Sequence, residues 1–194
     1  MRFRVFIALA LFATSPSTGT AQEYFWRDTA YPDLAIRGPA ATHGALLYNQ
    51  GRGVEVDGRG AAGDSFHLAP PAYVRKFHGA GWDLFKLNRK WAADNESSAI
   101  AAVHAEIARL RTEGYRRIVL AGQSYGAWLS VLAATRDGDL HAIIATAPGT
   151  GYGGESVDGT ALNAQKLVDF SSDLKPVRAA MFFFDGDPRD VAWL

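Results

Sequence analysis

The sequence predicts an α/β fold, a doubly wound and mainly parallel sheet with helices on both faces. The first observation is alternation, because strand-like and helix-like segments follow one another along most of the chain. The second is that several strand-like segments, such as GALLYNQ and HAIIATAP, are apolar throughout instead of at every second residue. Strands of that kind are typical of a parallel sheet covered on both faces. Ligands of such sheets bind at the carboxyl ends of the strands, so the residues after each strand are candidate site residues.

The elements in the first half of the chain can be placed in order. Two short strands are expected at 23–27 and 33–37, and an apolar strand follows at 44–50. The glycine-rich stretch GRGVEVDGRGAAGD is expected to be a long loop. A helix is predicted at 70–81, because proline lies at its start and glycine at its end. The next strand is predicted at 82–89.

The clearest helix is predicted at 97–114. Its apolar residues recur at steps of three and four, which places them on one face of a helix. They are Ile100, Val103, Ile107 and Leu110. A glycine ends this segment, as is common at helix carboxyl ends.

The remaining elements continue the alternation. Strands are predicted at 116–122, 141–148 and 176–185. Helices are expected from 125 to about 135 and at 163–170. With a balanced 20 basic and 20 acidic residues and 48% hydrophobic residues, the chain is expected to be one folded domain without affinity for nucleic acid.

The first 21 residues have the layout of a secretory signal peptide. Arg2 and Arg4 provide a positive start, and an apolar run at 5–13 leads to small and polar residues. The apolar run is shorter than the ~20 residues that a membrane span needs. We therefore expect 1–21 to be removed, 22–194 to be exported to the periplasm or the medium, and no stable membrane span to remain.

The stretch VLAGQSYGAW places Ser124 between two glycines, directly after a strand and before a helix. This is the G-x-S-x-G pattern of a nucleophile elbow, in which a tight turn projects a serine hydroxyl above the sheet. The backbone N–H of Tyr125 would lie at a helix amino terminus, where a negative oxygen is stabilised. The alternative is a glycine-serine turn that only caps the helix.

At this point the chain resembles the α/β-hydrolase family over most of residues 44–190. The resemblance implies a serine hydrolase in which Ser124 is the nucleophile and Tyr125 provides one oxyanion donor. It also implies a second donor in the loop after an earlier strand, where this chain has Gln-Gly-Arg-Gly in place of the family's His-Gly. Because the donor is a backbone N–H, this departure is mild. Arg52 is the first candidate for it and Gly51 the second.

The family order places an acid after a later strand, and this chain has three aspartates there. They follow the predicted strand at 176–185 in the stretch FFFDGDPRD. Asp187 most resembles the family's acid, while Asp190 competes with it because the length of the turn is open. The alternative is a solvated turn, since Asp-Gly and Asp-Pro are common in turns.

The histidine that the family places after the acid is missing, since none follows His141. His67, in the long loop, is the internal candidate that could reach the site. We expect the sequence to be a fragment of a longer α/β-hydrolase, with a final strand and helix missing and with little activity of its own. Without a base, a serine is a weak nucleophile at neutral pH.

The sequence therefore predicts a serine hydrolase that acts on carboxylic esters or related small acyl compounds. The alternative is a non-catalytic protein that keeps the fold as a binding or scaffold module. No cofactor and no metal are expected, because the chain has no cysteine and no phosphate-loop or dinucleotide motif. The substrate, the choice between hydrolysis and acyl transfer, and the oligomeric state remain open.

Overall fold

The structure is a computed structural model that describes most of the chain between residues 31 and 183. The described residues are 31, 34–51, 71–87, 89, 95–149, 165–170, 172–174 and 177–183. The predicted signal peptide at 1–21 and the predicted strand at 23–27 lie outside them.

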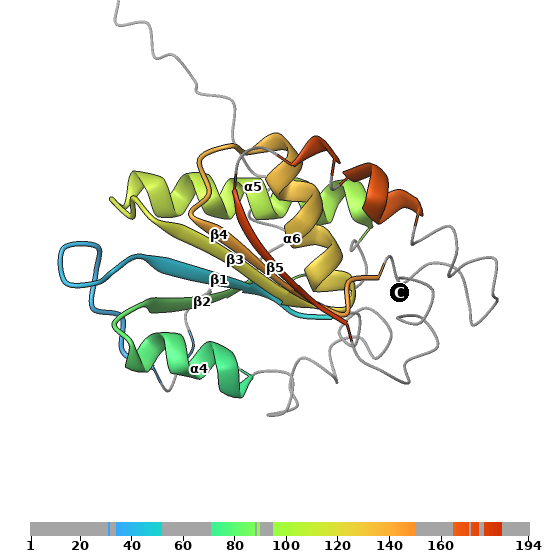
Figure 1. The fold of residues 1–194 in the computed structure, drawn as a ribbon. Coiled ribbons are helices and arrows are strands. Elements are labelled where there is room, and N and C mark those ends of the chain that lie inside the picture. Colours follow the sequence, from blue (N-terminus) through green and yellow to red (C-terminus); the bar gives the residue numbers. More distant parts are fainter. Residues whose placement is uncertain are drawn as a thin grey trace, which may run out of the picture.

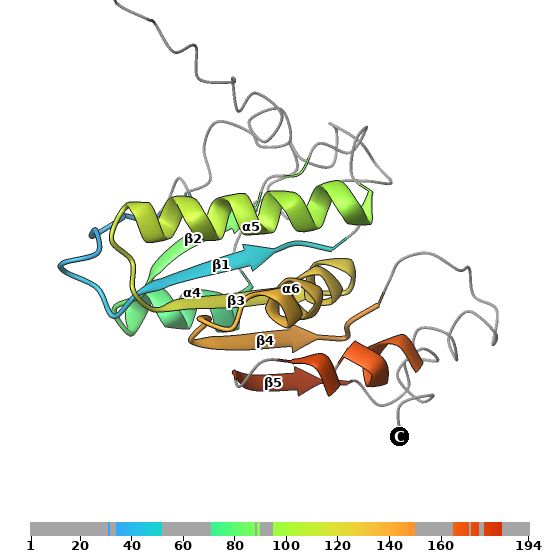
Figure 2. The ribbon, with the colours of Figure 1, turned by 90° about the horizontal axis from the view of Figure 1, so that it is seen from above.

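A parallel sheet forms the centre of the described structure. Its strands are β1 (Ala45–Asn49), β2 (Asp83–Leu87), β3 (Ile118–Gln123), β4 (Ala142–Thr146) and β5 (Arg178–Phe182). They pair in the order β2-β1-β3-β4-β5, and all four pairings are parallel. Figure 2 shows the strands side by side in this order. Every residue of β1 is buried, which agrees with its continuous apolar run. Every residue of β2 is buried as well, including Asp83 and Lys86. In β4, where HAIIATAP was expected to be buried throughout, buried and half-buried residues alternate.

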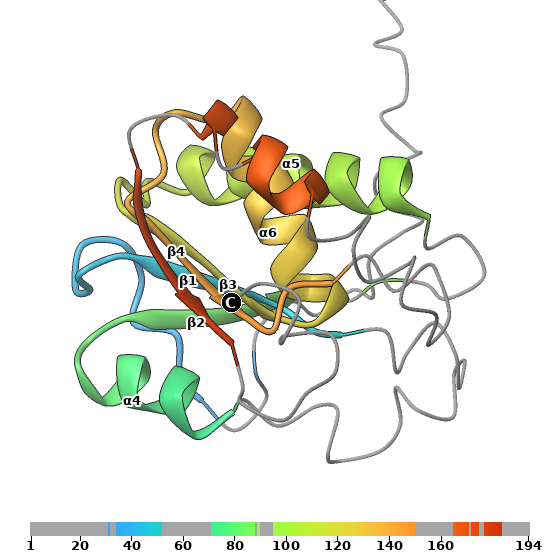
Figure 3. The same cartoon turned by 45° about the vertical axis from the view of Figure 1, so that its right-hand side comes forward.

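Helices cover both faces of this sheet. Helix α4 (Ala72–Gly79) lies on one face, and α5 (Glu96–Thr112) and α6 (Tyr125–Arg136) lie on the other, as Figures 1 and 3 show. This arrangement confirms the predicted doubly wound fold. A further helical segment at 165–170 agrees with the helix predicted there. Within the described part of the chain, no helix is long and apolar enough to cross a membrane.

Two apolar cores fill the space between the sheet and its helices. On the α4 face, Leu46 and Tyr48 pack with Val74. On the opposite face, Leu47 packs with residues of α5 and α6. The four periodic residues of the predicted long helix all belong to this second core. Successive β1 side chains point to opposite faces, so one strand contributes to both cores.

The expected strand at 33–37 is wrong over the residues that the structure describes there, because 34–37 form no strand. Backbone N–H groups at the end of this segment donate to a side chain instead of to a neighbouring strand. The N–H groups of Arg37 and Gly38 donate to the two carboxylate oxygens of Asp83, each at 2.9 Å. A donor bound to a side chain cannot also join a ladder of strand hydrogen bonds. Asp83 thereby anchors this segment at the amino end of β2.

Replacing Tyr115 with phenylalanine is expected to destabilise the fold by about 1.5–3 kcal/mol, the range for a hydrogen bond to a charged group. The Tyr115 hydroxyl donates to Asp83 at 2.8 Å, and Asp83 is fully buried. In the variant, one carboxylate oxygen of Asp83 loses the hydrogen bond from Tyr115, and water cannot replace it because Asp83 is buried. Urea denaturation of both proteins measures the effect, and a difference below about 0.5 kcal/mol, the usual range for surface substitutions, would contradict the anchoring role of Asp83.

Candidate active site

Two loops meet where the strand order of the sheet reverses. The chain leaves β1 to form β2 on one side and then returns to form β3 on the other side of β1. In open parallel sheets, ligands bind at the carboxyl ends of the strands at such a reversal. Gly51 follows β1 and Ser124 follows β3, so both lie at this point.

The backbone of Ser124 is held in a conformation that residues with a side chain rarely adopt. Its φ is 53° and its ψ is −124°. Neighbouring backbone fixes it, because its N–H donates to the Thr146 carbonyl at 2.9 Å and its own carbonyl accepts from Trp128 at 3.0 Å. Strained residues of this kind cost about 1–3 kcal/mol and persist only where the surroundings over-determine them.

The two glycines of the motif are required by close backbone approaches. A Cβ at Gly122 would lie 2.6 Å from the Ala127 nitrogen, because the helix passes directly over the strand end. A Cβ at Gly126 would lie 2.5 Å from the Gln50 carbonyl oxygen and closer still to that of Asn49. The sharp strand-to-helix turn and its contact with β1 therefore both depend on glycine.

The Ser124 side chain does not cap the helix that it precedes. It occupies the N-cap position of α6, yet it makes no side-chain capping hydrogen bond. Asn95 at the start of α5 provides the contrast, since its side chain accepts from the Ser98 N–H at 3.0 Å. Ser124 thus occupies the cap position without a side-chain capping hydrogen bond, and its side chain is half-buried.

Tyr125 and Gly51, the residues of two predicted donors, both lie beside Ser124. Tyr125 is the first residue of α6, so its backbone N–H lies at the positive end of the helix dipole. Gly51 packs against the serine, since a Cβ built on it would lie 3.5 Å from the Ser124 Cβ. Arg52, the first candidate for the second donor, lies outside the described residues.

A buried polar contact joins β1 to α6 behind the turn. The Asn49 side-chain amide donates to the Ser130 hydroxyl at 2.7 Å, and this hydroxyl donates to the Gly126 carbonyl at 2.9 Å. Both side chains are fully buried. The contact holds the end of β1 against the first turn of α6.

One residue beside the site is not indicated by any motif of the sequence. Arg89, two positions after β2, is 2% exposed and donates to the carbonyls of Gln50 and Gly51, both at 2.9 Å. Its guanidinium also lies 5.1 Å from the centre of the Tyr125 ring. The sequence pattern placed Arg89 at the end of the strand predicted at 82–89, which does not indicate its distant partners.

The predicted acids Asp185, Asp187 and Asp190 lie outside the described residues. The strand before them is described, and its last residue is Phe182. The Phe182 carbonyl accepts from the Ala147 N–H at 2.8 Å, just after β4. The chain thus leaves β5 at the same edge of the sheet where it leaves β3 and β4.

The four described histidines lie at the other end of the sheet or on its helices, and His67 lies outside the described residues. His141 donates its backbone N–H to Ile118, at the start of β3. Ser124 is six residues further along, roughly 20 Å at the rise of a strand. His43 pairs with Gly81 before β2, and His78 is on α4.

His104 lies on α5 and faces the far end of α6. Burial lowers its pKa, and Arg136 and Arg111 add to this effect, while Asp137 opposes it. Asp137 ends α6, whose 12 residues separate it from Ser124 by about 18 Å. None of the described histidines is therefore within reach of the Ser124 hydroxyl.

The lowered pKa of His104 predicts a loss of stability in mild acid. The unfolded chain takes up a proton at this side chain near its ordinary pKa of about 6.5, before the folded protein does. The free energy of unfolding therefore falls as the pH drops below that value. In His104→Gln this fall is expected to be smaller, as measured by urea denaturation at pH 7.5 and 5.5. An equal fall in both proteins would contradict the prediction.

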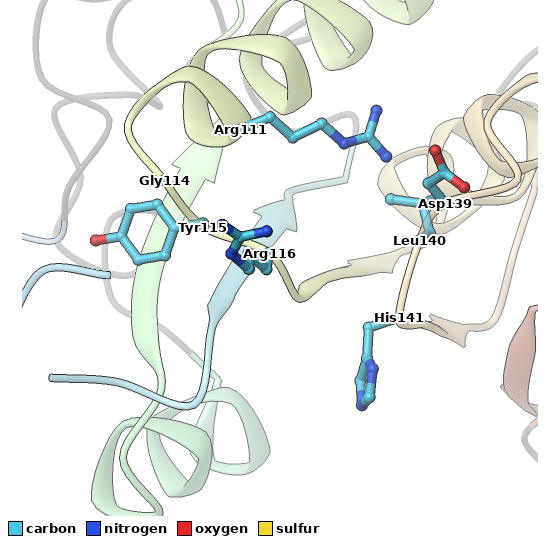
Figure 4. A pocket seen from close by; sticks show the side chains of 7 residues that line it. All are labelled: Arg111, Gly114, Tyr115, Arg116, Asp139, Leu140 and His141. Atoms are coloured by element: carbon cyan, nitrogen blue, oxygen red, sulfur yellow. The ribbon is translucent and has the colours of Figure 1, made fainter. Parts of the chain in front are cut away.

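A cavity among the described residues lies away from Ser124. It has a volume of about 630 Å³ and opens at the amino end of the sheet (Figure 4). Its lining residues are Arg111, Gly114, Tyr115, Arg116, Asp139, Leu140 and His141. Arg111 is already engaged there, since it donates to both carboxylate oxygens of Asp137 at 2.9 Å.

The strand order, the all-parallel sheet and the strained serine turn after β3 together define an α/β-hydrolase-like fold. No protein-family model matches the sequence, and no curated protein matches it. Similarity to solved structures is found with sequence identities of 11–18%.

Three of these solved structures match 71–76% of this chain. The first is a putative dienelactone hydrolase from Klebsiella pneumoniae, with a TM-score of 0.45 and 12% identity over 76% of this chain and 75% of that one. The second is Est1E from Butyrivibrio proteoclasticus, with a TM-score of 0.48 and 13% identity over 73% and 79%. The third is the Pyrococcus furiosus esterase Pf2001, with a TM-score of 0.47 and 11% identity over 71% and 59%.

Proposed function

We propose that this protein is a serine hydrolase that cleaves carboxylic esters or related small acyl compounds with Ser124 as its nucleophile. The observation that carries the proposal is the Ser124 turn. Its backbone is strained, its side chain does not cap the helix, and both flanking glycines are needed for close approaches. A strained backbone conformation that no capping hydrogen bond of the same residue compensates is typical of functional sites.

In this proposal the Ser124 hydroxyl attacks the carbonyl carbon of the bound ester. The carbonyl oxygen becomes negatively charged and accepts hydrogen bonds from the Tyr125 N–H and from the N–H of Arg52 or Gly51. The alcohol leaves with a proton, and water then cleaves the acyl-enzyme to release the acid and restore the serine. The position of Gly51 against the serine and of Tyr125 at a helix amino terminus supports this role.

The base in this proposal is a histidine that is absent from residues 1–194, oriented by Asp187 or Asp190. The described histidines support this by their positions, since all four are remote from Ser124. His67 is the competing candidate within the chain. The aspartates follow β5, whose carboxyl end lies at the edge of the sheet that carries Ser124.

Hydrolysis of p-nitrophenyl esters tests the proposal. The protein expressed from its complete reading frame is compared with the 194-residue chain and with the His67→Gln variant of each. We expect the complete protein to hydrolyse short acyl esters, the 194-residue chain to be nearly inactive, and His67→Gln to change neither rate.

Two other results would change the proposal. Loss of activity in His67→Gln would identify His67 as the base in place of a residue outside the chain. A folded complete protein that hydrolyses no acyl ester would favour the alternative of a non-catalytic binding protein.

A further inference from the structure

Arg89 is a buried positive charge that contacts the loop after β1. It is 2% exposed, and removing a guanidinium from water is costly unless hydrogen bonds compensate for it. Its Nη2 atom donates to the carbonyl oxygens of Gln50 and Gly51, both at 2.9 Å. These two residues directly follow the strand that ends beside Ser124.

Binding a carbonyl oxygen also fixes the N–H of the next residue. The Gln50 carbonyl and the Gly51 N–H belong to one planar peptide unit, and in a trans peptide they point in opposite directions. Because Arg89 holds the Gln50 carbonyl on its own side, the Gly51 N–H is directed away from Arg89. Gly51 is the residue that packs against Ser124.

Arg89 also contacts the second residue of the proposed oxyanion site. Its guanidinium carbon lies 5.1 Å from the centre of the Tyr125 ring, within the range of a cation–π interaction. Tyr125 is fully buried and begins α6. The Arg89 side chain, two residues after β2, thus contacts both the loop after β1 and the first residue of α6.

We propose that Arg89 is a positioning residue that holds the two oxyanion donors in register on either side of Ser124. The effect of Arg89 on catalysis rests on the proposed function of Ser124. The structural effect, the orientation of Gly51 relative to Tyr125, stands on the hydrogen bonds and the ring contact alone. The buried positive charge further favours a negative oxygen forming nearby.

The test uses Arg89→Met in the protein expressed from its complete reading frame. We expect kcat for a p-nitrophenyl ester to fall by about 10–100-fold, less than the 10²–10³-fold loss of a donor itself. KM is expected to change by less than about 3-fold, because the donors act mainly in the transition state. Arg89→Lys keeps the charge and one donor group, and it is expected to recover part of kcat.

Amide hydrogen exchange at Gly51 and Tyr125 tests the positioning role without relying on activity. Exchange at Gly51 is expected to be faster in Arg89→Met than in the unchanged protein. Arg109→Met is the matched control. The Arg109 guanidinium also makes a hydrogen bond, to the Glu106 carboxylate, and also lies over an aromatic ring, 5.3 Å from the centre of Phe85. Arg109→Met is expected to lower stability without altering Gly51 exchange or kcat.

The outcomes separate this inference from the proposed function. Absence of ester hydrolysis in the unchanged protein overturns the function of Ser124, while the exchange at Gly51 still decides whether Arg89 orients the loop. Unchanged exchange and unchanged kcat in a folded Arg89→Met overturn the positioning role. If Arg89→Met does not fold, the same two measurements are made on Arg89→Lys. The positioning role is then contradicted if kcat and Gly51 exchange are both equal to those of the unchanged protein.

Discussion

Replacing Ser124 with alanine is expected to lower the kcat for ester hydrolysis by about 10⁴–10⁶-fold, the range for removing a nucleophile from such a site. The variant keeps every backbone contact of the turn, and the hydroxyl makes no capping bond that could be lost. Its free energy of unfolding is therefore expected to stay within about 0.5 kcal/mol of the original value. Steady-state kinetics and urea denaturation on the complete protein measure the two quantities.

Ser130→Ala is the matched control for this prediction. Ser130 lies on the same helix and is fully buried, and its hydroxyl joins Asn49 to Gly126. Its loss leaves a buried amide with one partner fewer, at a cost of about 1–3 kcal/mol. The control is expected to be less stable but active, the opposite of Ser124→Ala. Retained hydrolysis in Ser124→Ala would mean that another group is the nucleophile.

Replacing Gly126 with alanine is expected to destabilise the fold by about 3 kcal/mol or more, at the upper end of the range for overpacking. The added methyl group would lie 2.5 Å from the Gln50 carbonyl oxygen and closer still to that of Asn49. These atoms are backbone, so the end of β1 must move away from α6. Because Gly51 and Arg52 follow directly, the proposed second oxyanion donor, the N–H of Arg52 or Gly51, would also move. Hydrolysis is therefore expected to fall together with stability.

Gly79→Ala provides the comparison for Gly126→Ala. Gly79 ends α4, and a Cβ built there meets nothing within 4 Å. Alanine is favoured over glycine in helices by up to about 1 kcal/mol, so this variant is expected to be as stable as the original or slightly more stable. Equal stabilities of the two alanine variants in urea would contradict the close approach of α6 to β1.

Much of the fold could be predicted because its signals are local. The apolar runs of β1 and β3 indicated buried parallel strands, and the periodic residues of α5 indicated its inner face. The turn at Ser124 was also predictable, since its glycines and its place between a strand and a helix lie within ten residues. Local patterns of this kind can be recognised in the sequence without knowledge of distant contacts.

The missed features depend on contacts between residues far apart in the sequence. The segment at 34–37 was expected to be a strand, but the Asp83 carboxylate, more than 40 positions away, binds its backbone. Arg89 contacts the carbonyls of Gln50 and Gly51, 39 and 38 positions earlier. No spacing rule connects such pairs, because the sheet topology alone brings them together.

Labelling with a fluorophosphonate probe tests the central claim most directly. The complete protein is treated with the probe and digested, and mass spectrometry locates the modified residue. We predict one adduct, on Ser124 in the peptide that contains GQSYG, and none when Ser124 is alanine. An adduct on a different residue, or no adduct on a folded protein that hydrolyses esters, would contradict the assignment of Ser124 as the nucleophile.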